Sequence, residues 1–382
     1  MKIAGIVAEY NPFHLGHQYQ CNRLRTEGYD GIVAVMSGNF VQRADVAVTD
    51  KYRRAQGAVA SGVDLVLELP LPYAVASAED FARGGIEVLA ATGIIDTLCC
   101  GCESGDEANR RQFESLCCAE EEGRVGQKMK LGLSYPAACR AAVTERGDCW
   151  SEEPNDVLAL AYRKALKKIA PHIPLFAIER KGSFHGDGSD GFESAQSIRK
   201  RLLDGQEIAA ALPPTSYSHL QDAPLAQLSL LERAILAYYR TAEAEQLKNF
   251  YAMREGLAQR IVRAADASSL AELFDRVKTK RFPHSAVRRA VLCGYLKIPA
   301  TLPPVSYLRV LAFNERGQKM LRRMKKEATL PVYTVLPPKI KEDPLGKIQL
   351  TGDEIFALAT EKPAEKYRDL TYSAKKTADF GN

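Results

Sequence analysis

Residues 3–20 read IAGIVAEYNPFHLGHQYQ, and this stretch decides the fold. Its first six residues are apolar and typical of a buried strand, a proline-containing segment at 11–13 breaks the strand, and the following residues are compatible with a helix. His14 and His17 are three residues apart and therefore lie on one face of a helical turn. The free N–H groups at a helix N-terminus attract anions, and Gly16 lets a ligand approach the backbone. The stretch therefore predicts a site for the phosphates of a nucleotide.

The alternation of apolar strand and helix continues through the first half of the chain. Further strands are predicted at residues 31–36, 63–69, 94–100 and 173–178, and helices at 14–25, 50–60, 77–91, 104–121, 154–168 and 194–203. Strands that are almost wholly apolar and alternate with helices form a parallel sheet covered on both faces. We therefore predict a Rossmann-like, doubly wound α/β fold, in which ligands bind beyond the carboxyl ends of the strands. The loops at 11–17, 37–40 and 101–105 should lie together on that rim.

The second half of the chain has a mainly helical pattern. Helices are predicted at residues 229–240, 247–265, 269–278 and 285–296, and a strand-turn-helix unit at 305–326. A stretch at 212–224 contains several prolines and separates the two patterns, as domain boundaries often do. We therefore expect a nucleotide-binding catalytic domain over residues 1–220, followed by a mainly helical domain over residues 221–382.

Charge is distributed unevenly between the two halves. Residues 251–350 hold 20 Lys and Arg against 8 Asp and Glu, a local excess of +12, whereas the whole chain carries +5. The remainder is therefore net −7. An acidic part joined to a basic part indicates that the basic part binds a polyanion.

The basic region interleaves cationic clusters with aromatic residues, among them Phe282, Tyr295 and Tyr307. Cations can hold the backbone of RNA, and aromatic rings can stack on bases splayed out from a loop. The alternative is a solvated helical face. The residues that we predict to bind RNA are Lys278, Lys280, Arg281, Arg288 and Arg289, with a second basic cluster at residues 322–326.

Several classes of protein are disfavoured. The chain has no run of about eighteen apolar residues and no signal-like leader, so we expect a cytoplasmic protein with reduced cysteines. Cys99, Cys102 and the pair at 117–118 resemble two halves of a zinc site, but a cysteine that ends an apolar strand is usually a small core residue, and no metal ligands are predicted. Neither a phosphate loop ending in Gly-Lys-Ser/Thr nor a G-x-G-x-x-G motif is present.

The His14-Leu15-Gly16-His17 motif, placed after a first strand, resembles the His-x-Gly-His signature of the nucleotidylyltransferase superfamily. This resemblance implies ATP binding, attack on the α-phosphate and release of pyrophosphate. The imidazoles could then stabilise charge on the transferring group, which is where catalysis of phosphoryl transfer mostly lies. The segment SAQSIR at 194–199 is similar to the second signature of that superfamily, although it departs from the Ser/Thr-rich form at its second and third positions.

A longer series of motifs resembles the bacterial tRNA(Met) cytidine acetate ligase family. It consists of AEYNPFHLGH, then MSGNFVQRADVAVTDKYRRA, then GVDLVLELPLPYAVASAEDFA, in that order. Membership would imply that acetate and ATP, with Mg²⁺ accompanying the ATP, form acetyl-adenylate. The acetyl group would then pass to N4 of the wobble cytidine of elongator tRNA(Met).

The resemblance also implies which residues form the site. His14 and His17 would be catalytic. The ATP-binding residues would be Val7, Ala8, Glu9, Tyr10, Asn11, Pro12, Phe13, His14, Leu15, Gly16, His17, Gln18, Tyr19, Gln20, Gly101, Asn155, Arg180, Ser194 and Arg199. Purely structural alternatives exist for Gly101, Asn155 and Arg180, namely a turn glycine, a helix cap and a surface ion pair. The corresponding alternatives are a surface or capping pair for the two histidines and a solvated helix charge for Arg199. We expect residues 37–40 and 42–43 either to face the acyl or cytidine side or to form a tight loop with an Asn cap. We expect Glu68 to be either functional or paired with a nearby base.

Two other functions remain open at this point. The first is a small-molecule adenylyltransferase, which the basic half disfavours because a small substrate would not need it. The second is a non-catalytic RNA-binding protein with a vestigial nucleotide fold, which the two intact histidines disfavour.

Overall fold

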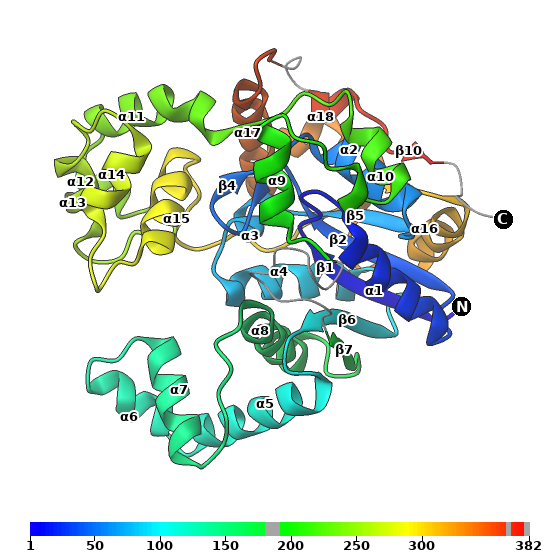
Figure 1. The fold of residues 1–382 in the computed structure, drawn as a ribbon, viewed down its shortest axis with the longest axis horizontal. Coiled ribbons are helices and arrows are strands. Elements are labelled where there is room, and N and C mark those ends of the chain that lie inside the picture. The colour runs from blue at the N-terminus through cyan, green and yellow to red at the C-terminus, as the bar shows by residue number, and fades with distance from the viewer. Residues whose placement is uncertain (180–191, 364–367, 378–382) are drawn as a thin grey trace.

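The computed structural model describes residues 1–179, 192–363 and 368–377 (Figure 1). Within them, a central sheet has the strand order β10-β8-β5-β2-β1-β6-β7, and β9 pairs with β8. The strands are β1 (Ile3–Ala8), β2 (Gly31–Ser37), β5 (Leu65–Leu69), β6 (Thr97–Cys102), β7 (Leu175–Glu179), β8 (Leu308–Phe313), β9 (Val332–Tyr333) and β10 (Lys375–Lys376).

The N-terminal strands form the predicted parallel sheet. β1 lies between β2 and β6, β5 follows β2, and β7 follows β6, and each of these pairs is parallel. The chain therefore first builds the sheet outward on one side of β1 and then returns to build it on the other side. This arrangement confirms the doubly wound α/β fold, and it creates a switch point between β1 and β6.

Helices cover both faces of the sheet because successive residues of a strand point to opposite sides. Ile3 and Val7 of β1 belong to the core with α4 (Ala78–Ala91) and α8 (Pro154–Ile169). Ala4 and Ile6 belong to the core with α1 (Leu15–Thr26) and α2 (Lys51–Ala60). The near-continuous apolar sequence of the strands follows from this burial on both faces.

The C-terminal part of the chain returns to the sheet. β8 runs antiparallel beside β5, and β10 pairs with β8 in parallel. The strand-turn-helix unit predicted at 305–326 is confirmed as β8 and α16 (Glu315–Glu327), but its place in the main sheet was not predicted. Three strands from the expected second domain thus belong to the sheet of the first. The division of the chain at residue 220 stays a prediction.

The mainly helical region, here called the helical lobe, spans residues 232–295. It contains α11 (Glu232–Thr241), α12 (Ala244–Leu247), α13 (Leu257–Arg263), α14 (Leu270–Val277) and α15 (His284–Tyr295). The single helix predicted at 247–265 is wrong. The chain between α12 and α13 forms a bridge from Phe250 to Pro299, and it then turns at Gly256, whose φ of 80° suits glycine.

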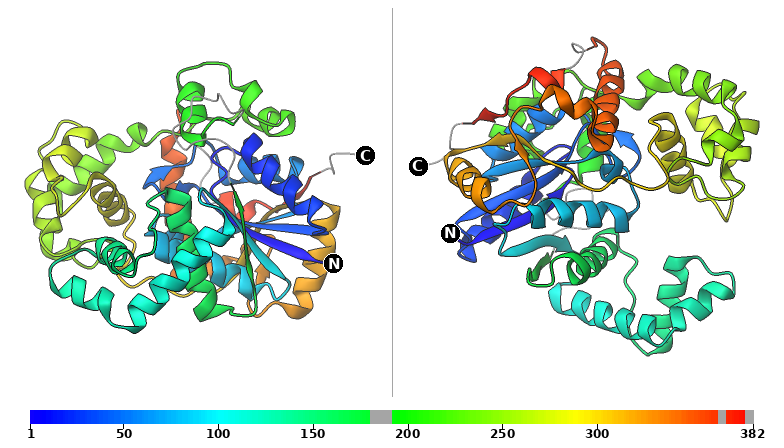
Figure 2. Two further views of the ribbon diagram at one scale, coloured as in Figure 1. Left: turned by 60° about the horizontal axis from the view of Figure 1, so that its bottom comes forward. Right: turned by 180° about the vertical axis from the view of Figure 1, so that it is seen from behind.

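A second, smaller lobe projects from the sheet and has its own apolar core (Figure 2). It is formed by α5 (Asp106–Glu121), α6 (Arg124–Lys130) and α7 (Tyr135–Glu145), which pack around Leu116 and Val143. None of the helices in the described part of the chain has the length and apolar character needed to cross a membrane.

Candidate active site

A pocket of about 310 Å³ lies at the switch point, beyond the carboxyl ends of β1, β6 and β7. Ligands of doubly wound sheets bind at this place, because the loops diverge there. Fourteen of the predicted ATP-binding residues line the pocket, namely Val7, Ala8, Glu9, Tyr10, Asn11, His14, Gly16, His17, Tyr19, Gln20, Gly101, Asn155, Ser194 and Arg199.

The two histidines form a reciprocal cap at the start of α1. Nδ1 of His14 accepts a hydrogen bond from the backbone N–H of Gly16 at 3.0 Å, and the backbone N–H of His14 donates to Nδ1 of His17 at 3.2 Å. His14 is thus the N-cap residue of α1. The prediction that it lies within the first helical turn is wrong. Because both Nδ1 atoms accept, the proton of each neutral ring sits on Nε2. Each ring therefore offers an Nε2–H donor.

Packing fixes the two rings in place. They stack on each other with centroids 3.8 Å apart, and the ring of His17 also meets Tyr10 and Phe13 edge-on or tilted, at 4.9 and 5.4 Å. A Cβ atom on Gly16 would lie 2.9 Å from Cε1 of His14. The glycine of the motif is therefore needed to leave room for the first histidine.

Four of the predicted ATP-binding residues do not line the pocket: Pro12, Phe13, Leu15 and Gln18. Phe13 is 1% exposed and packs in the core beneath His17. Leu15 and Gln18 lie on the side of α1 opposite to Gly16, His17 and Gln20, because a helix turns by about 100° per residue. A continuous motif in the sequence thus supplies only part of the pocket wall.

The second signature lies beside the first. Ser194 caps α9 (Ala195–Leu203), and its Oγ accepts from the backbone N–H of Ser197 at 3.2 Å. Nη1 of Arg199 donates to the backbone carbonyl of Asn11 at 2.7 Å, and burial lowers the pKa of this arginine from its ordinary value. The fold therefore brings the two predicted signatures together, although they are far apart in the sequence.

Gly101 and Asn155 face the pocket from the other side of the switch point. Gly101 is the fifth residue of β6, and Asn155 lies in the first turn of α8. The side-chain amide of Asn155 donates to Glu103, and the other oxygen of Glu103 accepts from the backbone N–H of Asp156 at 3.1 Å. The loop after β6 and the start of α8 thus hold each other. Arg180 lies outside the described residues.

An apolar wall of the pocket was not predicted. It includes Phe81 of α4, Leu158 and Tyr162 of α8, and Ile178 of β7. The spacing from Asn155 to Leu158 and Tyr162 is three and seven residues, so all three lie on one face of α8. This periodicity could have identified two of the wall residues from the sequence.

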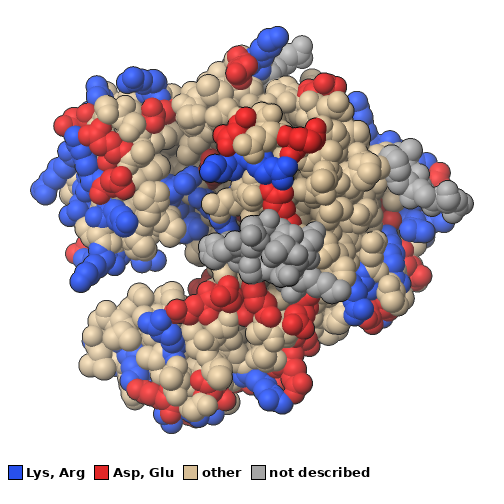
Figure 3. Space-filling model, viewed as in Figure 1, with Lys and Arg blue, Asp and Glu red and all other residues tan. Residues whose placement is uncertain are grey.

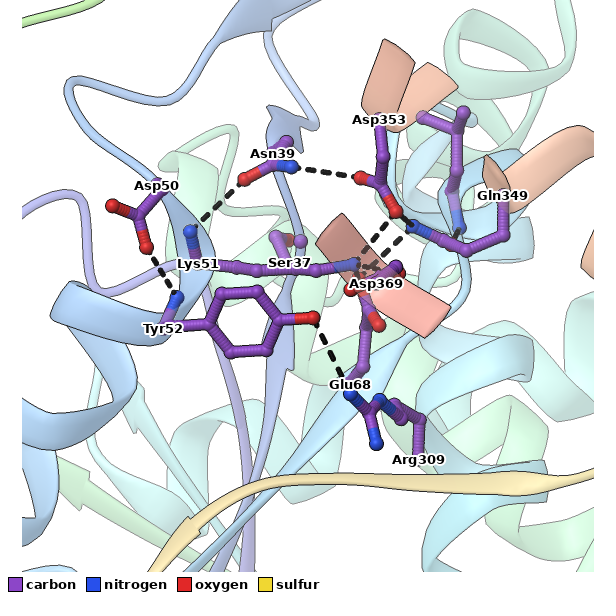
Figure 4. A network of polar contacts seen from close by, with 12 residues as sticks. Ser37, Asn39, Asp50, Lys51, Tyr52, Glu68, Arg309, Gln349, Asp353 and Asp369 are labelled. Atoms are coloured by element: carbon purple, nitrogen blue, oxygen red, sulfur yellow. Dashed lines mark hydrogen bonds and ion pairs between the residues drawn. The ribbon is translucent and has the colours of Figure 1, made fainter. Parts of the chain in front are cut away.

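Residues 37–40 do not line the pocket, whereas Gln42 and Arg43 do. The alternative of a loop with an Asn cap fits Asn39, whose Oδ1 accepts from the backbone N–H of Lys51 at 2.9 Å. Asn39 also joins a buried polar network around Lys51 (Figure 4). Nζ of Lys51 lies 2.8 Å from Glu68 and 2.7 Å from both Asp353 and Asp369. Glu68 is therefore paired with a base, which was one of its two predicted roles, and burial raises its pKa.

The residues predicted to bind RNA fall into two groups. Lys278, Lys280 and Arg281 are exposed between α14 and α15, on the lobe whose surface carries many lysines and arginines (Figure 3). By contrast, Arg288 pairs with Asp45 at 2.9 Å, and Arg289 donates to two backbone carbonyls.

One detail of the predicted RNA surface is wrong, and the second basic cluster lies apart from the first. Phe282 and Tyr307 are each 4% exposed, so they cannot stack on bases. The second basic cluster lies on α16, where Met320 packs against Gly31 at the start of β2. The starts of the parallel strands are at the edge of the sheet opposite to the pocket, so the two clusters face different sides of the molecule.

The fold and the paired histidines define a nucleotidyl transferase of the HIGH class, and a family model described as HIGH Nucleotidyl Transferase matches residues 1–370. The tRNA(Met) cytidine acetate ligase of Clostridium novyi is 34% identical over 378 residues, covering 92% of this chain and 94% of that relative. A ligase of the same name from Thermoanaerobacter is 33% identical, covering 94% of this chain and 96% of its own. The chain belongs to the tRNA(Met) cytidine acetate ligase family.

A solved structure supports the same assignment. The crystal structure of Thermotoga maritima TmcAL bound with alpha-thio ATP superposes with a TM-score of 0.87. The two chains are 28% identical, and the match covers 99% of this chain and 100% of that one.

Proposed function

We propose that this protein activates acetate with ATP and transfers the acetyl group to N4 of the wobble cytidine of elongator tRNA(Met). The observation that carries the proposal is the stacked, mutually capped histidine pair at the switch-point pocket, in a chain of this family. ATP is the activating substrate, and the products of the full reaction are acetylated tRNA, AMP and pyrophosphate. Such a reaction would take place in the cytoplasm.

In the first step, an oxygen of acetate attacks the α-phosphorus of ATP. The bond from the α-phosphorus to the bridging oxygen breaks, and pyrophosphate leaves with the electron pair. The Nε2–H groups of His14 and His17 supply donors for the charge that develops on the α-phosphate oxygens. The positive end of the α1 dipole adds to this effect. The apolar wall of Phe81, Leu158 and Tyr162 is suited to hold the adenine ring.

Mg²⁺ would enter with the nucleotide. In the described residues, no group of three or more His, Cys, Asp or Glu side chains is arranged to hold a metal ion. Mg²⁺ is commonly bound through substrate phosphates and only one or two carboxylates. Glu9, which lines the pocket, is a carboxylate that could assist, and the ion would neutralise phosphate charge.

In the second step, the cytidine amine attacks the carbonyl carbon of acetyl-adenylate. The bond from that carbon to the phosphate oxygen breaks, AMP leaves, and the amine releases a proton. No protein nucleophile takes part. Cys99 and Cys100 are buried in the middle of β6, and burial raises the pKa of Cys99 to about 12, which keeps it a thiol rather than a reactive thiolate.

The tRNA is held by the helical lobe. We propose that Lys278, Lys280 and Arg281 contact its phosphates, since all three are exposed and lie close together in the chain. The aromatic contacts predicted at Phe282 and Tyr307 are left out because both rings are buried.

The test has two stages. Purified protein should exchange radioactive pyrophosphate into ATP only when acetate is present, and should then transfer acetyl to purified elongator tRNA(Met). Exchange without transfer to tRNA would favour the small-molecule adenylyltransferase. An absence of any ATP consumption would favour the non-catalytic RNA-binding protein.

A further inference from the structure

One arginine joins the helical lobe to two separate segments that border the nucleotide pocket. From α15, Nε of Arg289 donates to the carbonyl of Val75 at 3.0 Å, and Nη2 donates to the carbonyl of Gln42 at 3.1 Å. Gln42 itself lines the pocket. Val75 ends the short helix α3 (Leu71–Ala74) and leads into α4, which supplies Phe81 to the pocket wall. A single guanidinium therefore ties together three parts of the chain.

The contact at Gln42 continues into the pocket. The backbone N–H of Gln42 donates to Oε1 of Glu9 at 2.8 Å, and Glu9 directly follows β1 and lines the pocket. Arg54 holds the same residue from the other side, since its Nη1 donates to the carbonyl of Glu9 at 2.7 Å. The Glu9 side chain thus accepts from the same residue whose carbonyl Arg289 binds, so the position of Gln42 couples the two side chains.

Gln42 lies in a hairpin that is too short to be stable on its own. Its two strands, β3 (Phe40–Val41) and β4 (Asp45–Val46), have two residues each, and short isolated hairpins are at best marginally stable. Between them, Ala44 has a positive φ of 57°. The hairpin lies beside α15 (Figure 1), where Arg288 pairs with Asp45 at 2.9 Å. Contacts from the helical lobe therefore act together with the burial of Phe40, Val41 and Ala44 in keeping the hairpin in place.

The lobe grips the start of α4 at a second point. The hydroxyl of Tyr251 donates to Oδ2 of Asp80 at 2.6 Å and accepts from the backbone N–H of Ser77 at 3.1 Å. Both segments that Arg289 joins are thus anchored to the lobe rather than left as loose rims. The lobe is placed to shape the pocket as well as to hold tRNA.

We propose that Arg289 is a positioning residue for the nucleotide pocket, which holds Gln42 against Glu9 and so sets the affinity for ATP. This inference rests on the proposed function in that the nucleotide is ATP. It replaces the sequence-based prediction that Arg289 binds RNA. Both donors that the structure records for this side chain are directed to protein carbonyls, in contrast to the exposed Arg281.

The test uses exchange of pyrophosphate into ATP without tRNA. In Arg289→Met, the KM for ATP should rise about tenfold while kcat changes little, because a charge-assisted hydrogen bond to each segment is lost. Arg289→Lys can still reach one carbonyl, so its KM for ATP should lie between those of the parent protein and Arg289→Met. Arg263→Met, an exposed arginine of the same lobe, is the matched control and should leave the KM unchanged.

Two further measurements separate the possible failures. Calorimetric binding of a non-hydrolysable ATP analogue should weaken about tenfold in Arg289→Met even if acetate chemistry is absent, so it tests this inference apart from the proposed function. If Arg289 acts on ATP through Glu9, the double variant Arg289→Met/Glu9→Gln should lose less binding free energy for the analogue than the sum of the losses in the two single variants.

An unchanged KM and analogue affinity in Arg289→Met, together with weaker tRNA binding, would overturn the inference and restore the RNA-binding role. If Arg289→Met fails to fold, as judged by thermal unfolding, the same comparison is made with Arg289→Lys. An analogue affinity in that variant equal to that of the parent protein would equally overturn the inference.

Discussion

At the scale of single residues, the two nitrogen atoms of each histidine ring have different hydrogen-bonding roles. Nδ1 of each ring accepts a backbone N–H in the reciprocal cap, which leaves Nε2–H as the donor of each ring. The same hydrogen bonds that start α1 therefore also set the tautomer that the proposed mechanism uses to stabilise a phosphate oxygen. Local structure and chemistry depend on the same atoms.

Replacing His17 by Ala should abolish adenylate formation while leaving tRNA binding nearly intact. The change removes one Nε2–H donor and the ring on which His14 stacks, and loss of one such donor typically costs about 10²–10³ in rate. Acetate-dependent pyrophosphate exchange and a tRNA-binding titration measure the two effects. His172→Ala, at an exposed position, serves as the control. Release of tRNA with exchange retained would contradict the assigned role.

Replacing Gly16 by Ala should reduce exchange by about tenfold to a hundredfold, because the new Cβ would lie 2.9 Å from His14 and displace its ring. Gly126→Ala is the matched control, since no atom lies within 4 Å of the Cβ built there. Exchange rates of the two variants are compared at saturating ATP. Equal rates would show that the ring can move aside without loss.

At the scale of elements, Lys51 connects parts of the chain that are distant in sequence. It lies at the start of α2, and its three carboxylate partners come from β5, from α17 (Pro344–Phe356) and from α18 (Arg368–Thr371). Burial alone would lower the pKa of Lys51, but the three carboxylates raise it above its ordinary value. The lysine therefore stays charged and fastens the C-terminal helices to the nucleotide-binding sheet.

Replacing Lys51 by Met should destabilise the fold by about 3–5 kcal/mol, because two buried carboxylates and the partly buried Asp353 lose their common partner. Urea unfolding followed by circular dichroism measures the change. Lys167→Met, at a side chain that is 59% exposed, should change stability by less than about 0.5 kcal/mol. A similarly small change for Lys51→Met would mean that the carboxylates are accommodated by protons instead.

The elements differ in how well the sequence predicts them. Strands such as β1 and β2 are identified by unbroken apolar runs, and α4 by its cap at Ser77. The helix predicted at 247–265 failed because its break is fixed by a distant contact with Pro299, which no local pattern reveals. The pairing of β8 with β5 was missed for the same reason, since the sequence of an apolar strand does not indicate which other strand it pairs with.

At the scale of the whole molecule, the basic residues that form one excess in the sequence are divided between two faces. Lys278, Lys280 and Arg281 lie on the helical lobe, whereas α16 lies at the edge of the sheet opposite to the pocket. Composition measures the charge of a region but not the direction in which it faces.

Replacing Lys278, Lys280 and Arg281 together by Gln should weaken tRNA binding by about tenfold and flatten the slope of log affinity against log salt by about 2. Exchange of pyrophosphate without tRNA should not change. The comparison variant replaces Arg322 and Arg323 of α16 by Gln and should keep the tRNA affinity of the parent protein. Weaker tRNA binding in that variant would place the RNA on the opposite edge.

The site shows the same division between local and global information. The signature at His14–His17 and the cap at Ser194 follow from short motifs, and the structure brings them to one pocket. The apolar wall and the grip of Arg289 on Gln42 depend on how the lobe and the hairpin meet. A basic residue in the region predicted to bind RNA is thus directed at the protein itself.

The return of β8 to the sheet has a consequence for how the protein is made. Until β8 leaves the ribosome, β5 is an apolar edge strand with unpaired backbone groups, a surface on which nascent chains aggregate. The whole helical lobe is synthesised in the interval from residue 69 to 308, which lasts roughly ten to fifty seconds at typical rates of translation. The first strands of the sheet are therefore made early, but the edge of β5 stays unpaired for most of synthesis. We expect chaperones to bind the nascent chain during that time.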